Sequence, residues 1–101
     1  MNQRISNLRN KMKAQNLKAV LINNLKNVYY LTNFWGSNGT ALVTEERVVL
    51  FTDSRYTIHA HATCFPFVEI VETRNELEEA SKIIKDAAIQ ELGFEDEITV
   101  A

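Results

Sequence analysis

The 101-residue sequence contains one cysteine, Cys64, one proline, Pro66, and only three glycines. A single cysteine excludes an internal disulfide, which fits a reducing compartment. No apolar run approaches the roughly 20 residues of a membrane-spanning helix, and the polar N-terminal segment lacks the apolar core of a signal peptide. We therefore expect a cytoplasmic protein that has no contact with a membrane.

The chain also lacks a strong charge of either sign. Its formal net charge is -2, so the charge balance does not favour binding to nucleic acid or to an anionic membrane. Hydrophobic residues make up 46% of the chain and charged residues 24%, which is ordinary for a globular domain. A chain of this length can bury one core, so we expect a single domain over residues 1–101. Because residues 98–101 contain no stop signal, we also expect this domain to be a fragment of a longer protein.

Short apolar segments between polar turns predict the strands. Ala19–Ile22 is a continuous apolar run, which is typical of a strand buried on both faces. Residues 40–44 and 47–52 are separated by a two-residue turn and predict an antiparallel hairpin. Further strands are expected at residues 67–71 and 92–95. Together with the predicted helices, these segments indicate an α/β fold: a three-layer domain with a mixed parallel/antiparallel sheet of about five to six strands flanked by helices.

Apolar spacing predicts a helix at the start of the chain. Ile5, Leu8 and Met12 are spaced to lie on one face of a helix over residues 3–16. Asn2 is expected to be its N-cap, because an asparagine side chain accepts hydrogen bonds from the amides of the first turn.

Capping residues mark three more helices. Asn27 is expected to cap a short helix, and Asp53 is expected to cap a helix over residues 54–63. Asn75 is expected to cap a longer helix, which Gly93 would end. The expected apolar stripe of this last helix consists of Leu77, Ala80, Ile84, Ala87 and Ala88.

Several residue types used in catalysis are present, but their spacing favours structural roles. His59 and His61 are two residues apart, so on a helix they do not face the same metal ion. No basic cluster surrounds Cys64 in the sequence, which favours a buried thiol over a nucleophile. The loop Gly36-Ser37-Asn38-Gly39 lacks both the lysine and the following helix of a phosphate-binding loop.

Asp53, Arg55 and Trp35 are the candidate site residues. Asp53 and Arg55 follow a predicted strand, at the end where open α/β sheets bind ligands, and arginine offers a planar charged fork for carboxylates or carbonyl groups. The alternatives are local: capping is the favoured role for Asp53, whereas Arg55 either binds a ligand or pairs with a neighbouring acid. Trp35 is either a core residue or an exposed anchor for an interface.

Four blocks of the sequence occur in a characteristic order. They are Asn27-Val28-Tyr29-Tyr30-Leu31-Thr32, Phe34-x-Gly36-Ser37-Asn38-Gly39, Leu42-Val43-Thr44-Glu45 and Phe51-Thr52-Asp53-x-Arg55-Tyr56. Together they resemble the creatinase/prolidase-type N-terminal domain of Xaa-Pro peptidases, over nearly the whole chain. The resemblance implies a ribonuclease H-like fold. The chain departs from the family at Asn33 and Ser54, where the family usually has glycine.

The resemblance also implies a function. It implies the non-catalytic N-terminal domain of an Xaa-Pro aminopeptidase or dipeptidase, a hydrolase that cleaves the bond before proline. A C-terminal pita-bread metallopeptidase domain, absent from this chain, would hold two divalent metal ions, expected to be manganese by analogy with the family. The domain would support a homodimer and border an active site, often that of the partner subunit. Arg55, Asp53 and Trp35 are then expected to face that site, with Arg55 contacting a proline-containing peptide.

Two alternative functions remain open from the sequence. The same domain could serve a creatinase-like amidinohydrolase or a chain without activity. Alternatively, it could be a self-contained module that binds a partner protein or a small ligand. Under the favoured interpretation the 101-residue fragment is inactive by itself, because bond cleavage belongs to the catalytic domain.

Overall fold

The computed structural model of the protein describes residues 3–100, whose five strands form one sheet in the order β4-β3-β2-β1-β5. The strands are β1 (Ala19–Ile22), β2 (Thr40–Thr44), β3 (Val48–Thr52), β4 (Glu69–Glu72) and β5 (Leu92–Phe94). β2 runs antiparallel to β1 and β3, whereas β5 is parallel to β1 and β4 is parallel to β3. The carboxyl ends of four strands, β1, β3, β4 and β5, therefore lie along the same side of the sheet. The prediction of a mixed sheet is confirmed.

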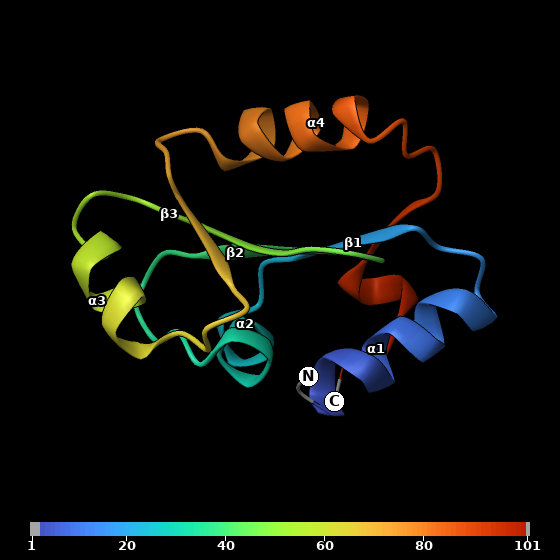
Figure 1. Ribbon diagram of the computed structural model, residues 1–101, viewed down its shortest axis with the longest axis horizontal. Helices are drawn as coiled ribbons and strands as arrows, with labels where there is room; N and C mark the ends of the chain where they lie inside the picture. Colours follow the sequence, from blue (N-terminus) through green and yellow to red (C-terminus); the bar gives the residue numbers. More distant parts are fainter. Residues whose placement is uncertain (1–2, 101) are drawn as a thin grey trace.

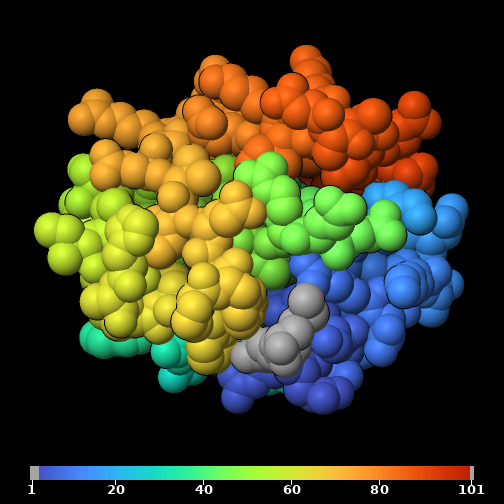
Figure 2. Space-filling view, viewed as in Figure 1, coloured from blue at the N-terminus to red at the C-terminus, as the bar shows by residue number. Residues whose placement is uncertain are grey.

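Helices cover both faces of this sheet (Figure 1). They are α1 (Gln3–Ala14), α2 (Leu25–Thr32), α3 (Thr57–Thr63) and α4 (Glu76–Asp86), followed by the short 3-10 helix η1 (Glu95–Glu97). The first three helices lie on one face and α4 lies on the other, where it forms a layer facing away from α1 (Figure 2). The three-layer arrangement is thus confirmed. Within residues 3–100, no helix has the length and apolar character needed to cross a membrane.

The larger part of the core lies under α1 and α2. Ile5, Leu8 and Met12 of α1 are buried, which confirms the predicted apolar face. They pack with the side chains of β1, β2 and β3 that point to this face of the sheet. The helix ends at Ala14, two residues before the predicted boundary, and the proposed cap Asn2 lies outside the described residues.

The start of α2 corrects one prediction. Its N-cap is Asn24, whose side chain accepts hydrogen bonds from the amides of Lys26 and Asn27. Asn27 was expected to be the cap, but its side-chain amide instead donates to the carboxylate of Glu95 at 2.8 Å. The same carboxylate accepts from the backbone amide of Asn24 at 2.6 Å and from that of Asn23. An acidic side chain beyond β5 therefore satisfies the amides at the start of α2, where the helix dipole favours a negative charge.

The end of α4 corrects a second prediction from the sequence. Asn75 caps the helix as predicted, with its side chain accepting from the amide of Glu78 at 3.1 Å. The apolar stripe is only partly buried: Ala80 and Ile84 pack on the sheet, whereas Leu77 is 65% exposed. Ala87 and Ala88 also lie at the surface, because the helix already ends at Asp86.

Gly93 does not end this helix, as had been expected, but lies within β5. Ala88 takes the left-handed backbone conformation after α4, with φ of 55°. At Gly93 a Cβ atom would lie 2.6 Å from Leu17 Cδ1, so the missing side chain lets the Leu17 side chain approach the strand. The role of this glycine is close packing between distant segments, which local sequence does not reveal.

Candidate functional site

Asp53 and Arg55 form an ion pair at the carboxyl end of β3. The Arg55 side chain donates from Nε to Asp53 Oδ1 at 3.1 Å and from Nη2 to Asp53 Oδ2 at 2.8 Å. The Arg55 side chain is 68% exposed, whereas the Asp53 side chain is 17% exposed. The charged fork therefore faces solvent at the sheet edge where ligands bind in open α/β sheets, and it is held from below by a largely covered carboxylate.

The prediction that Asp53 caps the following helix is wrong. The helix α3 starts at Thr57, later than the predicted 54–63, and its N-cap Tyr56 makes no side-chain capping bond. The carboxylate of Asp53 is occupied otherwise: besides the Arg55 side chain, it accepts from the Arg55 amide at 2.9 Å and from Asn38 Nδ2 at 2.8 Å. Residues 53–56 instead form a turn closed by the Tyr56 amide on the Asp53 carbonyl, at 3.1 Å.

These donors fix the charge of Asp53. The hydrogen bonds from Arg55 and then from Asn38 hold the pKa of the Asp53 carboxyl far below its ordinary value. The same pair raises the pKa of Arg55, which is charged at any physiological pH in any case. Near neutral pH the pair is therefore a permanent ion pair, and neither side chain acts as a general acid or base.

An open, mostly apolar hollow lies beside this pair. It has a volume of about 740 Å³ and is lined by Trp35, Gly36, Ser37, Tyr56 and His59. Trp35 is 64% exposed, and its ring centroid lies 4.7 Å from that of His59 in an edge-to-face arrangement. Trp35 is therefore exposed and is not a core residue.

Phe34 supports the hollow from inside the core. It is 1% exposed, and its ring centroid lies 6.0 Å from both Tyr56 and His59. A Cβ atom at Gly36 or Gly39 would lie 2.8 Å from the Phe34 ring, so both glycines let the loop fold closely over it. The loop glycines thus serve packing on an aromatic ring, in agreement with the structural interpretation of this loop.

The hydroxyl groups of Tyr56 and Ser37 close one side of the hollow. They are hydrogen-bonded to one another, and this bond from Ser37 lowers the pKa of the Tyr56 phenol. Tyr56 also carries the Arg55 guanidinium near its ring, with Arg55 Cζ 5.2 Å from the ring centroid. The tyrosine therefore links the arginine to the hollow.

The structure brings together Asp53, Arg55 and Tyr56 with the loop that contains Trp35. It adds Asn38, Phe34 and His59, which the sequence analysis did not assign to the site. The block Phe34-x-Gly36-Ser37-Asn38-Gly39 carried the signal for Phe34 and Asn38, since it is one of the blocks, together with the Asp-x-Arg-Tyr block, on which the family resemblance rests. His59 had no such signal, because only folding places α3 against Trp35.

None of the described residues offers a metal site. Within residues 3–100, no three His, Cys, Asp or Glu side chains lie close enough together to hold a metal ion. His59 belongs to the hollow, and His61 is exposed on α3. The donor set needed for a divalent metal is therefore missing from this part of the protein.

Cys64 is expected to be a slow nucleophile. Burial raises the pKa of its thiol to about 11, so the thiolate fraction at neutral pH is roughly two orders of magnitude below that of an ordinary cysteine. Modification by DTNB should accordingly be about 100-fold slower than in the chain unfolded in urea. Equal rates in the folded and unfolded chain would contradict this burial.

Comparisons with known proteins agree with this geometry. The sequence matches the creatinase/prolidase N-terminal domain family over residues 4–101. It is 32% identical over 93 residues to an uncharacterized peptidase of Bacillus subtilis, covering 91% of this chain and 26% of the relative. The chain therefore spans about a quarter of that protein.

Two solved structures share the fold. A Streptococcus pyogenes Xaa-Pro aminopeptidase structure has 40% identity and a TM-score of 0.87, covering 96% of this chain and 74% of that chain. The N-terminal domain of a cytoplasmic peptidase, PepQ, from Mycobacterium tuberculosis has 36% identity and a TM-score of 0.88. The match covers 97% of this chain and 76% of that chain. With its family match, its five-stranded mixed sheet and its Asp-x-Arg-Tyr turn, this chain belongs to the creatinase/prolidase N-terminal domain family.

Proposed function

We propose that this chain is the N-terminal, non-catalytic domain of a cytoplasmic Xaa-Pro peptidase, an aminopeptidase or dipeptidase that hydrolyses the bond before proline. Its membership of the family and its similarity to the Streptococcus pyogenes aminopeptidase support this assignment. The observation that carries it is the exposed Arg55 fork, which Asp53 holds in place beside the hollow of Trp35. An exposed arginine that is fixed in this way is suited to bind another molecule.

Bond cleavage is assigned to a separate catalytic domain. Residues 3–100 do not fit a metal ion, so in this proposal two divalent ions, manganese by analogy with the family, would be held by a C-terminal pita-bread domain of the full-length protein. When bound there, such ions activate the water that attacks the peptide bond. The present domain contributes by positioning substrate and by excluding water from the active site.

In this proposal Arg55, Asp53 and Trp35 border the active site. The edge of the sheet that carries them would face the catalytic domain of a partner subunit, in a homodimer. Trp35, which is exposed beside an apolar hollow, provides a contact surface of the kind found in interfaces. Arg55 would contact the proline-containing peptide itself.

Replacing Arg55 by alanine tests this role in the full-length protein. Because a hydrogen bond to a charged group contributes about 1.5–3 kcal/mol, kcat/KM for an Xaa-Pro peptide is expected to fall roughly 10- to 100-fold. The metal content and the melting temperature should remain close to those of the wild type. An unchanged kcat/KM would remove Arg55 from the substrate contacts.

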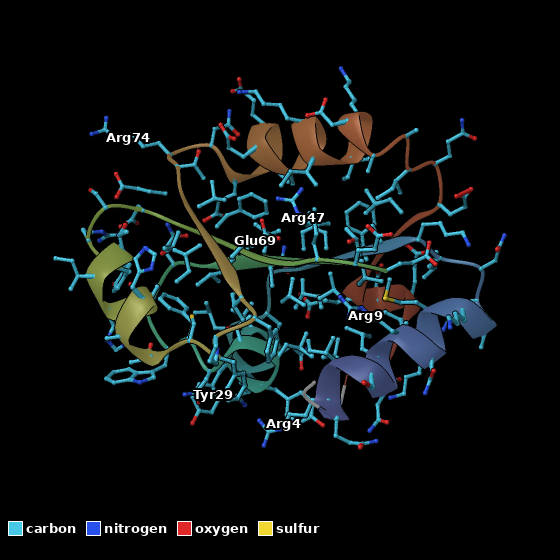
Figure 3. The ribbon with its side chains drawn as sticks, in the orientation of Figure 1. Arg4, Arg9, Tyr29, Arg47, Glu69 and Arg74 are labelled. Carbon is cyan, nitrogen blue, oxygen red and sulfur yellow. The ribbon has the colours of Figure 1, made fainter. Side chains whose placement is uncertain are left out.

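The protein contains a matched control pair. Arg47 donates to Glu69 in the same two-point manner, with both distances 2.8 Å (Figure 3). This pair lies where β3 and β4 begin, at the opposite edge of the sheet. An R47A variant loses the same kind of ion pair, and its kcat/KM should stay within about twofold of the wild type, as for a surface substitution remote from the site.

The assignment to a non-catalytic domain has its own test. The purified 101-residue chain should not cleave an Xaa-Pro peptide, with or without manganese, whereas the full-length protein should. Cleavage by the chain alone would overturn the proposal. If the full-length protein hydrolysed creatine and no Xaa-Pro peptide, the amidinohydrolase alternative would replace it.

A further inference from the structure

We propose that Arg55 and Asp53 together form a receptor for a neutral carbonyl oxygen, such as a peptide carbonyl, and not for a carboxylate. This inference rests on the proposed function, because it specifies what Arg55 contacts in the substrate. It also gives Asp53 a different role from Arg55: Asp53 acts through the arginine and does not itself touch the ligand.

The hydrogen bonds of Arg55 define the shape of the receptor. A guanidinium has five N–H groups, and Asp53 takes one from Nε and one from Nη2. The other three, on Nη1 and Nη2, make no hydrogen bond to residues 3–100, and the Arg55 side chain is 68% exposed. The Tyr56 ring restricts the guanidinium further, since Arg55 Cζ lies 5.2 Å from its centroid. The outer N–H groups therefore present a fixed set of donors to the outside.

The charge of Asp53 decides which acceptor suits these donors. A carboxylate bound at Arg55 would be attracted by the guanidinium but repelled by the Asp53 carboxylate directly behind it. A carbonyl oxygen accepts the same N–H groups without carrying a net charge, so this repulsion is absent. Asp53 thus selects against anions, in the way that unfavourable charges give specificity at interfaces.

Asp53 is itself held so that it stays charged and in place. Asn38 donates from Nδ2 to Asp53 Oδ2 at 2.8 Å, and the same oxygen also accepts from Arg55 Nη2. The backbone carbonyl of Asn38 in turn accepts from Thr52 Oγ1 at 2.7 Å, which ties the loop to the end of β3. Asn38 and Asp53 are therefore positioning residues for the arginine.

The first test uses two substrates and the full-length protein. An Xaa-Pro peptide that the wild type hydrolyses is compared with the same peptide carrying a C-terminal amide. The R55A variant is expected to lower kcat/KM by the same factor for both, because the donors bind a carbonyl group that both share. A loss confined to the free acid would overturn the carbonyl assignment while leaving Arg55 in the site. A loss for neither substrate would instead show that the proposed function of Arg55 is wrong, and the inference with it.

The second test uses sulfate as a probe of anion binding. The D53N variant leaves the charge of Arg55 uncompensated, so sulfate should inhibit it competitively at a concentration at least about fivefold lower than for the wild type, at constant ionic strength. The double variant D53N/R55A should lose this added sensitivity. E69Q, which uncovers Arg47 at the opposite sheet edge, should behave like the wild type. Sulfate inhibition of D53N at the wild-type concentration would overturn the role assigned to Asp53, and so would added sensitivity that persists in the double variant.

Discussion

Replacing Phe34 by alanine is expected to lower the free energy of unfolding by about 3–5 kcal/mol, the range found for removal of a buried phenylalanine. The Phe34 side chain is 1% exposed and lies under the loop that carries Gly36 and Gly39. Neither glycine has a side chain that could fill the space left behind, so a cavity should remain. Since a domain of this size has only about 5–15 kcal/mol of stability in total, urea unfolding should shift to a much lower midpoint.

A second phenylalanine provides the control. Phe67 is 37% exposed and stacks on Phe65, with ring centroids 5.6 Å apart. Its replacement by alanine should cost about 1 kcal/mol, mainly the loss of one aromatic pair. F34A should also change the fluorescence of Trp35, the only tryptophan, because His59 and Tyr56 lose their packing partner. Equal destabilisation by F34A and F67A would contradict the supporting role of Phe34.

Replacing Glu95 by alanine should lower the free energy of unfolding by about 2 kcal/mol, in the range for hydrogen bonds to a charged group. Its carboxylate accepts from the amides of Asn23 and Asn24 and from the side chain of Asn27. Without it, these donors at the start of α2 lose a partly buried acceptor and its favourable interaction with the helix dipole. Urea unfolding measures the loss, and hydrogen exchange of the two backbone amides should become faster.

Two variants separate charge from position. E95Q keeps an acceptor oxygen but loses the charge, so its loss should be about half that of E95A. D96A alters the exposed neighbouring acid and should stay within about 0.5 kcal/mol of the wild type. If D96A were as destabilising as E95A, general electrostatics near η1 would explain the result and the contact of Glu95 with α2 would not.

Local patterns predicted most of the fold. The buried strand β1 is a continuous apolar run, and the face of α1 is set by the spacing of Ile5, Leu8 and Met12. The Asn75 cap needs only Glu78, three residues further on. In each case the residues that determine the helix, strand or cap lie within a few positions of it, so the pattern can be read from the local sequence.

The predictions that proved wrong concern residues whose roles depend on contacts with distant parts of the chain. Asn24 and not Asn27 caps α2, because Glu95 engages the Asn27 side chain from the other end of the chain. Gly93 is needed where Leu17 approaches β5, and no pattern around residue 93 indicates that contact. Such errors are expected wherever tertiary contacts decide between two local options of similar energy.

The candidate site was predictable in part for the same reason. The position of Asp53 and Arg55 after an apolar strand places them at the carboxyl edge of the sheet, and the structure has them there. The sequence did not show that Asp53 binds Arg55 in preference to the amides of α3, since a cap was locally adequate. Nor did it show Asn38 as the third partner, because that contact joins two loops across β2 and β3.

The pairing of β1 with β5 has a consequence for synthesis on the ribosome. The first strand emerges early, but its outer neighbour, Leu92–Phe94, is the last of the five strands of this sheet to be translated. Until then the nascent chain carries an open strand edge, which is a site for wrong pairing or for a chaperone. Completion of the sheet therefore has to wait until β5 has been translated, and translational stalling before residue 92 leaves an intermediate prone to aggregate.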